Sequence, residues 1–464
     1  MLLRRLAAGV VLPLCAAPLS AAGLFDQTIE LSVLGTYESG IFAEGAAEIA
    51  AHDPATQRLF VTNADASSVD VLDISLPAAP TLLFTIDLAP YGGGVNSVAV
   101  DGGRVAVAVE ADVKQDPGKV VFFDTDGNHL AHVEVGALPD MVTFTPNGRV
   151  VLVANEGEPN DDYSVDPEGS ISVIWLPGNL AQLKQQHVRT ADFRQYDQGR
   201  PVPQGVRIFG PGASVAQDLE PEYIAVSRDS STAWVTLQEN NALAKVDIRH
   251  ARVVDLLPLG SKDHAAGPQT AEGVTALFAA DFNGLDASDR DDAINIRPWP
   301  VQGLYLPDAI ASYTLFGRTF LLTANEGDAR DYDGFSEEAR VKDLVLDPVA
   351  YPDAATLQLD ENLGRLKTTV VDGDADLDGD VDQIFSYGAR SFSIWSEDGA
   401  LVYDSGEEFE QILARALPDD FNATNDENGS FDNRSDDKGP EPEGITIGKV
   451  GVHTYAFIGL ERVG

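Results

Sequence analysis

Six pairs of short apolar runs recur along this sequence, and in each pair an acidic or amide residue stands at both outer ends. The first run starts at one such residue, a polar turn such as "DPATQ", "TPNG" or "SRDSS" follows, and the second run ends at another. The two ends lie 14 to 18 residues apart. Alternating apolar runs bounded by turn residues predict β-hairpins. The six pairs are Glu48 with Asn63, Asn96 with Glu110, Asp140 with Glu156, Glu222 with Glu239, Asp308 with Glu326 and Glu443 with Glu461.

This repetition predicts an all-β chain arranged as a β-propeller. The start of the first strand and the end of the second lie at the same end of a hairpin. When hairpins are repeated radially they form the inner strands of propeller blades. We therefore expect the acids to gather on one face around the central channel; the alternative is that each acid ends its own strand at the surface. The acidic-face candidates are Glu48, Glu110, Asp140, Glu156, Glu222, Glu239, Asp308, Glu326, Asp328, Glu443 and Glu461.

Six hairpins are visible, and the sequence stops at "YAFIGLERVG", at the end of a predicted strand. Propellers close on themselves to avoid open strand edges. We therefore expect the last blade or blades of the complete ring to be missing from this chain. Helical periodicity is confined to 179–186 and 409–417, and the acidic insertions 157–170, 327–343 and 419–440 are expected to be loops on the acidic face.

The charge balance excludes one class of partner. The chain has 31 Lys and Arg against 74 Asp and Glu, a formal net charge of −43. Such a surface repels nucleic acid and anionic membranes and attracts cations. Solubility in salty surroundings is the alternative explanation for the excess acid.

The first 22 residues have the features of an export signal. Arg4 and Arg5 precede the apolar stretch "LAAGVVLPLCAAPLS", and Ser20-Ala21-Ala22 offers a cleavage site. The only cysteine, Cys15, lies inside this segment, so the mature chain has no disulfide or thiol chemistry. We expect residues 23–464 to form one propeller domain without a transmembrane span, in a periplasmic, extracellular or cell-surface location.

The stretch "DGDADLDGDVD" at 372–382 is the strongest candidate for a metal site. Its acids match positions one, three, five, seven and nine of an EF-hand-type loop, and Gly379 stands at position six. Phe385 occupies position twelve in place of the usual glutamate, and no helix is expected on either side. We expect calcium, with another divalent metal as a possibility; a solvated acidic turn is the alternative. The predicted ligands are Asp374, Asp376, Asp378, Asp380 and Asp382.

The acidic stretches 326–343 and 156–166 are weaker candidates. Their spacing is looser, and the first contains arginine and lysine. For 326–343 an internal ion-pair network is an equally good explanation.

The motifs of common enzyme classes are missing from the sequence. There is no Gly-x-Ser-x-Gly elbow, P-loop, dinucleotide fingerprint or His-Glu-x-x-His, and histidine numbers only 7. The remaining catalytic hypothesis is metal-assisted phosphoester hydrolysis, with clustered carboxylates holding metal. Arg330, Arg390 or Arg462 would then clamp phosphate, although a structural ion pair is the first expectation for Arg390.

Four stretches together resemble the choice-of-anchor I family: "GAAEIAAHDPATQRLFVTN", "ANEGDARDYDGFSEEARVKDL", "DGDADLDGDVDQIFSYGARSFSIW" and "GPEPEGITIG…FIGLER". That family includes animal mesenchyme-specific cell-surface glycoproteins linked to biomineralisation, and bacterial members labelled alkaline phosphatase-like. The resemblance covers nearly all of the mature chain. It implies a seven-bladed propeller that is secreted or held at the cell surface by a C-terminal anchor.

The sequence therefore favours an exported, calcium-binding propeller that acts as a binding, adhesion or mineral-associated scaffold. Its expected partners are divalent cations and a surface glycan, mineral or protein. The alternative is a secreted, metal-dependent, alkaline phosphatase-like phosphoesterase with its site on the acidic face. The oligomeric state is left open.

Overall fold

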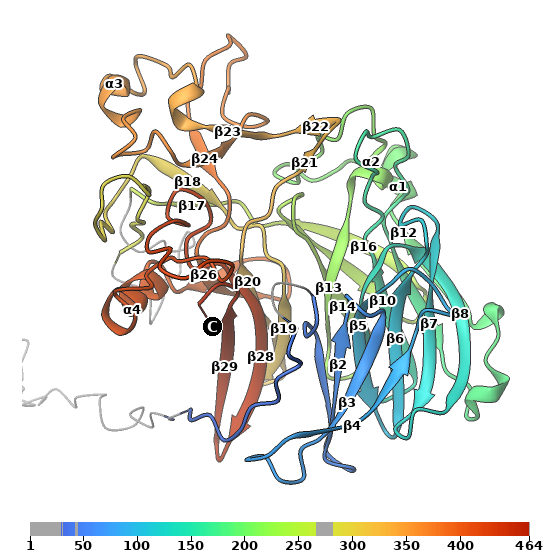
Figure 1. The fold of residues 1–464 in the computed structure, drawn as a ribbon. Coiled ribbons are helices and arrows are strands. Elements are labelled where there is room, and N and C mark those ends of the chain that lie inside the picture. Colours follow the sequence, from blue (N-terminus) through green and yellow to red (C-terminus); the bar gives the residue numbers. More distant parts are fainter. Residues whose placement is uncertain (1–28, 30, 42–44, 266–281, 464) are drawn as a thin grey trace, which may run out of the picture.

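The computed structural model describes residues 29, 31–41, 45–265 and 282–463 (Figure 1). The predicted export signal and Cys15 lie outside the described residues. Across the described part of the chain, no helix combines the length and apolar character needed to cross a membrane.

Antiparallel sheets of four strands are the repeating unit of the fold. The first blade contains β1 (Ala50–Asp53), β2 (Arg58–Asn63), β3 (Ser68–Asp73) and β4 (Thr81–Asp87). The second contains β5 (Gly94–Asp101), β6 (Arg104–Glu110), β7 (Pro117–Asp124) and β8 (His129–Ala137). The third contains β9 (Pro139–Phe144), β10 (Val150–Asn155), β11 (Ser170–Trp175) and β12 (Val188–Asp192).

Two further sheets and a hairpin continue the series. The fourth blade contains β13 (Pro221–Val226), β14 (Thr232–Leu237), β15 (Ala242–Asp247) and β16 (Arg252–Pro258). The fifth contains β19 (Ile310–Leu315), β20 (Arg318–Asn325), β26 (Ser391–Ser396) and β27 (Leu401–Asp404). The hairpin of β28 (Pro442–Val450) and β29 (His453–Leu460) follows.

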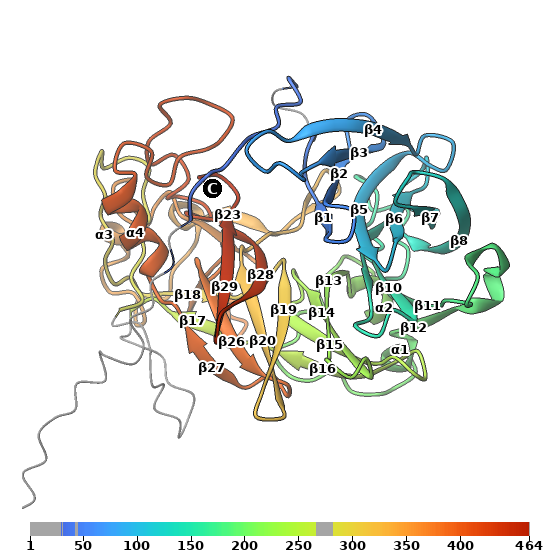
Figure 2. The same ribbon diagram turned by 90° about the horizontal axis from the view of Figure 1, so that it is seen from below.

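The first strands of these units are neighbours around a common centre (Figure 2). In order they are β1, β5, β9, β13, β19 and β28, and each contacts the next. All six predicted hairpins are present in the expected order. The prediction of an all-β propeller is therefore confirmed.

Strand β6, "RVAVAVE", shows why the sequence folds into stacked blades. Val105, Val107 and Val109 pack with the first blade, against residues such as Phe60. The residues between them face the other way, and Ala106 packs with the third blade. A strand that is apolar on both faces needs a sheet on each side, because side chains alternate along it.

A satellite region lies beside the fifth blade and outside the ring (Figure 2). Strand β18 pairs in parallel with β25, although the other strand pairs of the fold are antiparallel within the described residues. Its own core includes Leu285, Trp299, Leu363 and Ile384. The region contains β17 (Ser261–Asp263), β18 (Val301–Leu304), β23 (Glu338–Arg340), η4 (Val341–Asp343), α3 (Ala354–Leu357), β24 (Lys367–Thr369), β25 (Ile384–Ser386) and α4 (Glu408–Ala416).

Two local expectations differ from the structure. The segment 179–186 forms the 3-10 turns η2 (Leu180–Gln182) and η3 (Gln185–His187) in place of one helix. The segment 327–343 was expected to be a loop but contains short strands. Strand β21 (Asp331–Tyr332) pairs with β22 (Phe335–Ser336) in a small hairpin, and β23 pairs with β24. The expected helix at 409–417 is confirmed as α4, and the short helices α1 (Arg194–Asp197) and α2 (Val215–Asp218) were not expected.

Candidate functional site

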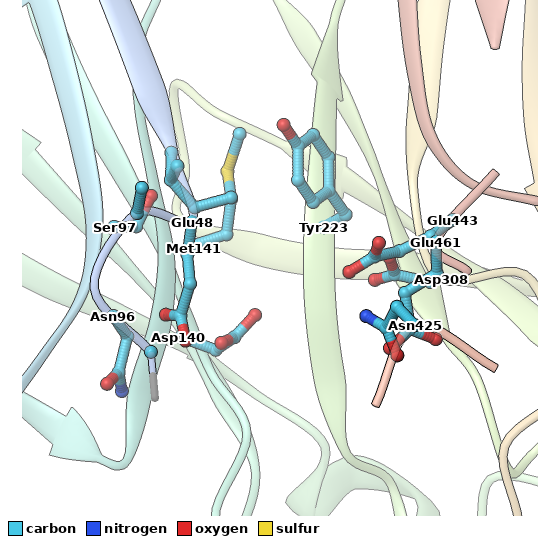
Figure 3. Close-up of a pocket in the computed structure, with 13 residues that line it drawn as sticks. Glu48, Asn96, Ser97, Asp140, Met141, Tyr223, Asp308, Asn425, Glu443 and Glu461 are labelled. Carbon is cyan, nitrogen blue, oxygen red and sulfur yellow. The ribbon is translucent and has the colours of Figure 1, made fainter. Parts of the chain in front are cut away.

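A cavity of ≈ 530 Å³ opens where the first strands begin. Glu48 and Asp140 stand on one wall, and Asp308, Glu443 and Glu461 stand on the opposite wall (Figure 3). Asn96, Met141, Tyr223 and Asn425 complete much of the lining. The structure therefore places these acids together, as the hairpin pattern predicted.

A repeated corner aims the acids into this cavity. Leu138, Leu306 and Glu441 each precede a proline and adopt a positive φ, of 44°, 41° and 48°. Non-glycine residues rarely occupy this region. The turned carbonyl of each accepts a hydrogen bond from the end of the second strand: from Glu156 N at 2.9 Å, Gly327 N at 3.1 Å and Glu461 N at 2.9 Å. Both ends of each hairpin are thus tied together, and the residue after the proline points its carboxylate inward.

A group of channel carboxylates lacks direct ion-pair partners in the described part of the chain, although the more distant charge of Arg330 acts on one of them, Glu239. Among the described residues none of its members forms an ion pair. Glu222 and Glu239 are 6% and 8% exposed, and Oε2 of each lacks a hydrogen-bond partner. Burial of ionised oxygen atoms without a partner is costly. We call these five residues the free carboxylate group: Asp140, Glu156, Glu222, Glu239 and Asp308.

Burial and mutual repulsion hold the protons on this group. Burial, then the charges of Glu158 and Glu48, raises the pKa of Asp140 to about 7. Burial also raises the pKa of Glu239 to about 7. The pKa values of Glu156, Glu222 and Asp308 lie well above their ordinary range for the same reasons. A divalent cation bound among these acids would favour their ionised forms and so oppose both causes.

A neighbouring cluster of acids, which includes Glu461 of the opposite wall, is paired with the protein's own cations. Carboxylate oxygens of Glu326, Glu441 and Glu461 lie within 4.8 Å of one another. Lys438 pairs with Glu326, and Arg462 pairs with Glu441 at 2.9 Å and with Glu461 at 3.0 Å. Asp328 is 3.5 Å from Lys438 and its side chain is largely exposed. For the stretch 326–343, an internal ion-pair network was the alternative to a metal site. Glu326 and Asp328 belong to such a network.

The three arginines considered as phosphate clamps are already engaged. Arg330 is 2% exposed and pairs with Asp218 and with Glu220 at 2.9 Å. Arg390 is 4% exposed and binds Glu410 at 2.7 Å and three backbone carbonyls. Arg462 lies beside the cavity, but its two acidic partners and Asn425 bind its N–H groups. Arg330 and Arg390 are thus structural residues rather than clamps.

The 372–382 loop lies in the satellite region, away from the central cavity. Asp374 Oδ1 and Oδ2 accept hydrogen bonds from the amides of Asp378 and Gly379, both at 3.1 Å. Oxygens of Asp374, Asp376 and Asp382 lie within 4.8 Å of one another, whereas Asp378 and Asp380 are outside that group. The charge of Asp378 raises the pKa of Asp376, and burial followed by the Asp378 charge raises that of Asp380. Gly379 has a φ of 100°, as the turn requires.

Glu110 ends β6, opposite Gly94 of β5, and forms no ion pair with a described residue. It lies near the charge of Glu158, a residue absent from the list of acidic-face candidates. Glu158 accepts a hydrogen bond from Tyr332 of the β21–β22 hairpin at 3.1 Å. Tyr332 also meets Tyr163 edge-on, with ring centroids 5.3 Å apart. This hairpin lies above the blades (Figure 1), so Tyr332 connects it to the acids of the channel.

A repeated tripeptide in the sequence marks two acids that the sequence analysis did not single out, Glu220 and Glu441. The tripeptide Glu-Pro-Glu occurs at 220–222 and at 441–443. In both cases the first glutamate binds an arginine and the second faces the channel: Glu220 binds Arg330, and Glu441 binds Arg434 and Arg462. In each Glu-Pro-Glu tripeptide, the first acid is therefore structural and the last acid faces the channel.

Two curated proteins are similar to parts of this chain. It is 26% identical over 324 residues to the Mesenchyme-specific cell surface glycoprotein of Strongylocentrotus purpuratus, covering 62% of this chain and 38% of that protein. It is 35% identical over 114 residues to Gigasin-3a of Magallana gigas, covering 24% of this chain and 40% of that protein. The chain thus spans less than half the length of these relatives.

Among solved structures, the β-propeller domain of Cps50 (Swd1) from Myceliophteria thermophila is similar with a TM-score of 0.33 and 10% identity. That alignment covers 58% of this chain and 63% of the other. The family model of the choice-of-anchor I domain matches residues 48–464, which include the five blades, the terminal hairpin and the satellite region. The chain belongs to the choice-of-anchor I domain family.

Proposed function

We propose that this protein is an exported or surface-held scaffold whose central channel binds divalent cations, with calcium as the first candidate. The observation that carries the proposal is the free carboxylate group, five buried or half-buried acids that converge without an ion pair to any described residue. Calcium prefers such all-oxygen sites and accepts six to eight ligands with flexible geometry. Binding would replace repulsion between blades with attraction to a shared ion.

The location rests on the relatives. One of them is a cell surface glycoprotein by name, and the export signal predicted at 1–22 agrees with that location. We propose that such a scaffold holds a surface glycan, a mineral or another protein.

The arginines favour a scaffold over phosphoester hydrolysis, because their N–H groups are already bound to acids of the protein. An arginine needs free N–H donors to bind phosphate. The N–H groups of Arg330 and Arg390 already bind buried acids. Arg462 would have to leave Glu441 and Glu461 first.

The proposal is tested by calcium titration of the full chain and of Glu222→Gln and Glu239→Gln, followed by calorimetry and thermal unfolding. Glu361→Gln is the matched control, because Glu361 is exposed and lies outside the channel. Wild type should gain about 2–3 kcal/mol at a calcium concentration about 100-fold above Kd. The channel variants should be more stable than wild type without calcium, because glutamine folds without taking up the proton that the buried glutamate needs, and they should gain less from calcium.

Equal calcium responses in wild type and both channel variants would overturn the channel site. An aryl phosphate assay on the same proteins separates the two functions. Turnover that needs calcium and is lost in Glu222→Gln would replace the scaffold with a metallophosphatase.

The 372–382 loop is proposed as a second, weaker calcium site. Asp374, Asp376 and Asp382 bring three oxygens together, but several of their lone pairs already bind loop amides. Asp376→Asn should therefore remove one calcium equivalent of low affinity, in the range of about 0.1–1 mM typical of extracellular modules. Unchanged stoichiometry would leave the loop as a solvated turn.

A further inference from the structure

Two histidines stand side by side on the outer strand of the second blade. His129 Nε2 and His132 Nδ1 lie 3.5 Å apart. The ring of Tyr91 stacks on His129, with centroids 5.5 Å apart and planes 19° apart, and meets His132 edge-on at 5.7 Å. Phe123 contacts His129 from another side at 5.9 Å. These aromatic contacts hold both imidazoles in defined positions.

A β-bulge brings the two rings to the same face. Residues three apart normally point to opposite faces of a strand. In β8, however, Phe122 pairs with Ala131 while Phe123 pairs with His129, so Leu130 is an extra residue. His132 pairs with Val121, two positions before Phe123, and therefore shares the face of His129. Bulges commonly redirect side chains in this way.

The two ring nitrogens are close enough to share one metal ion and far enough apart to form only a weak hydrogen bond. A separation of 3.5 Å is long for a nitrogen hydrogen bond, which is usually 2.7–3.2 Å. Neither imidazole forms an ion pair or another side-chain hydrogen bond with a described residue. Imidazole nitrogen is a preferred ligand of zinc, copper and nickel, whereas carboxylate oxygen suits calcium.

We propose that His129 and His132 form an exposed binding site for a divalent transition-metal ion, separate from the acidic channel. Strand β8 is the outermost strand of its blade, whereas the channel is lined by first strands. Glu134 follows on the same face of β8, opposite Lys119, but its carboxylate does not join the two imidazoles in a three-ligand cluster. The remaining coordination positions are open to water or to a group on a partner molecule.

The test is a zinc titration of the full chain with calcium in excess, so that the carboxylate sites are filled. One zinc site should survive, and His129→Gln and His132→Gln should each weaken it by at least about 10-fold, since loss of even a supporting residue costs a metal site about 10–100-fold. His250→Gln is the control, because His250 is exposed and bound to Asp247.

A spectroscopic measurement identifies the ligands directly and does not depend on the measured affinity. Electron paramagnetic resonance of bound Cu²⁺ should show two imidazole nitrogens in wild type and in His250→Gln, and one in each of the other variants. Thermal unfolding confirms that the variants are folded. The proposal is overturned if no calcium-resistant zinc site exists, or if both histidine variants bind zinc as wild type does.

Discussion

At the scale of single residues, Asp432 shows how one buried acid makes stability depend on pH. It is 3% exposed, its Oδ1 accepts a hydrogen bond from Ser435 at 2.5 Å, and its Oδ2 has no partner. Burial, opposed by the Ser435 hydrogen bond and reinforced by the charges of Asp286, Asp291 and Glu410, raises its pKa to about 8. The folded chain therefore keeps a proton that the unfolded chain releases above about pH 4.

We predict that Asp432→Asn stabilises the protein progressively as pH rises. Between about pH 5 and pH 8 the unfolded wild type binds fewer protons than the folded state, so this carboxyl lowers the free energy of unfolding as pH rises. Asparagine has no such proton and tolerates the observed φ of 66°. The variant should gain about 1–3 kcal/mol over this range, measured by urea unfolding. Asp419→Asn, at an exposed position, is the control; a gain independent of pH would contradict the assignment.

Which acids stay unpaired could not be predicted from the sequence, because the neutralising cations come from far along the chain. Lys438 reaches Glu326 over 112 positions, and Arg207 reaches Asp372 over 165. Strand periodicity is local, so it placed Asp140, Glu222 and Asp308 at the channel. It carries no information about which neighbouring blade supplies an arginine.

At the scale of strands, a repeated Ala-Asn-Glu-Gly corner ties the second strand of a blade to the third. Asn155 Nδ2 donates to Ser170 O at 3.1 Å and to Ser172 Oγ at 3.0 Å. Asn325 makes equivalent bonds to Ser391 Oγ at 3.2 Å and Ser393 Oγ at 2.8 Å. Both asparagines are fully buried.

Replacing either asparagine by alanine should cost about 2–4 kcal/mol, because each change leaves buried polar groups without partners. The matched control is Asn428→Ala at an exposed loop position, which should change stability by less than about 0.5 kcal/mol. Chemical unfolding with urea measures both. Equal effects at buried and exposed positions would show that the corner does not hold the strands together.

The sequence predicted the corners and hairpins because turn residues and period-two runs are local signals. It did not predict the parallel pairing of β18 with β25, which joins Val301 to Ile384. Parallel pairing leaves no turn signature, since its connection can be of any length beyond about a dozen residues.

At the scale of the whole molecule, the proposed channel ion would link three blades. The free carboxylate group draws Asp140 from the third blade, Glu222 and Glu239 from the fourth and Asp308 from the fifth. Calcium should therefore slow hydrogen exchange at the starts of β9, β13 and β19 together, while β3 and β4 of the first blade are unaffected. Mass spectrometry of exchanged peptides with and without chelator measures this, and protection confined to one blade would contradict a shared ion.

The satellite region also has a consequence for how the chain folds. Asn325 and Ser391 pair across β20 and β26 although 66 positions separate them, whereas 15 positions separate Asn155 from Ser170 in the third blade. Closing the longer loop costs about 1.3 kcal/mol more entropy if the intervening chain is flexible. A satellite that has already collapsed on its own core, around Trp299 and Leu363, shortens that loop. We therefore expect the earlier blades, whose contacts are local, to form first, and the fifth blade to assemble after the satellite.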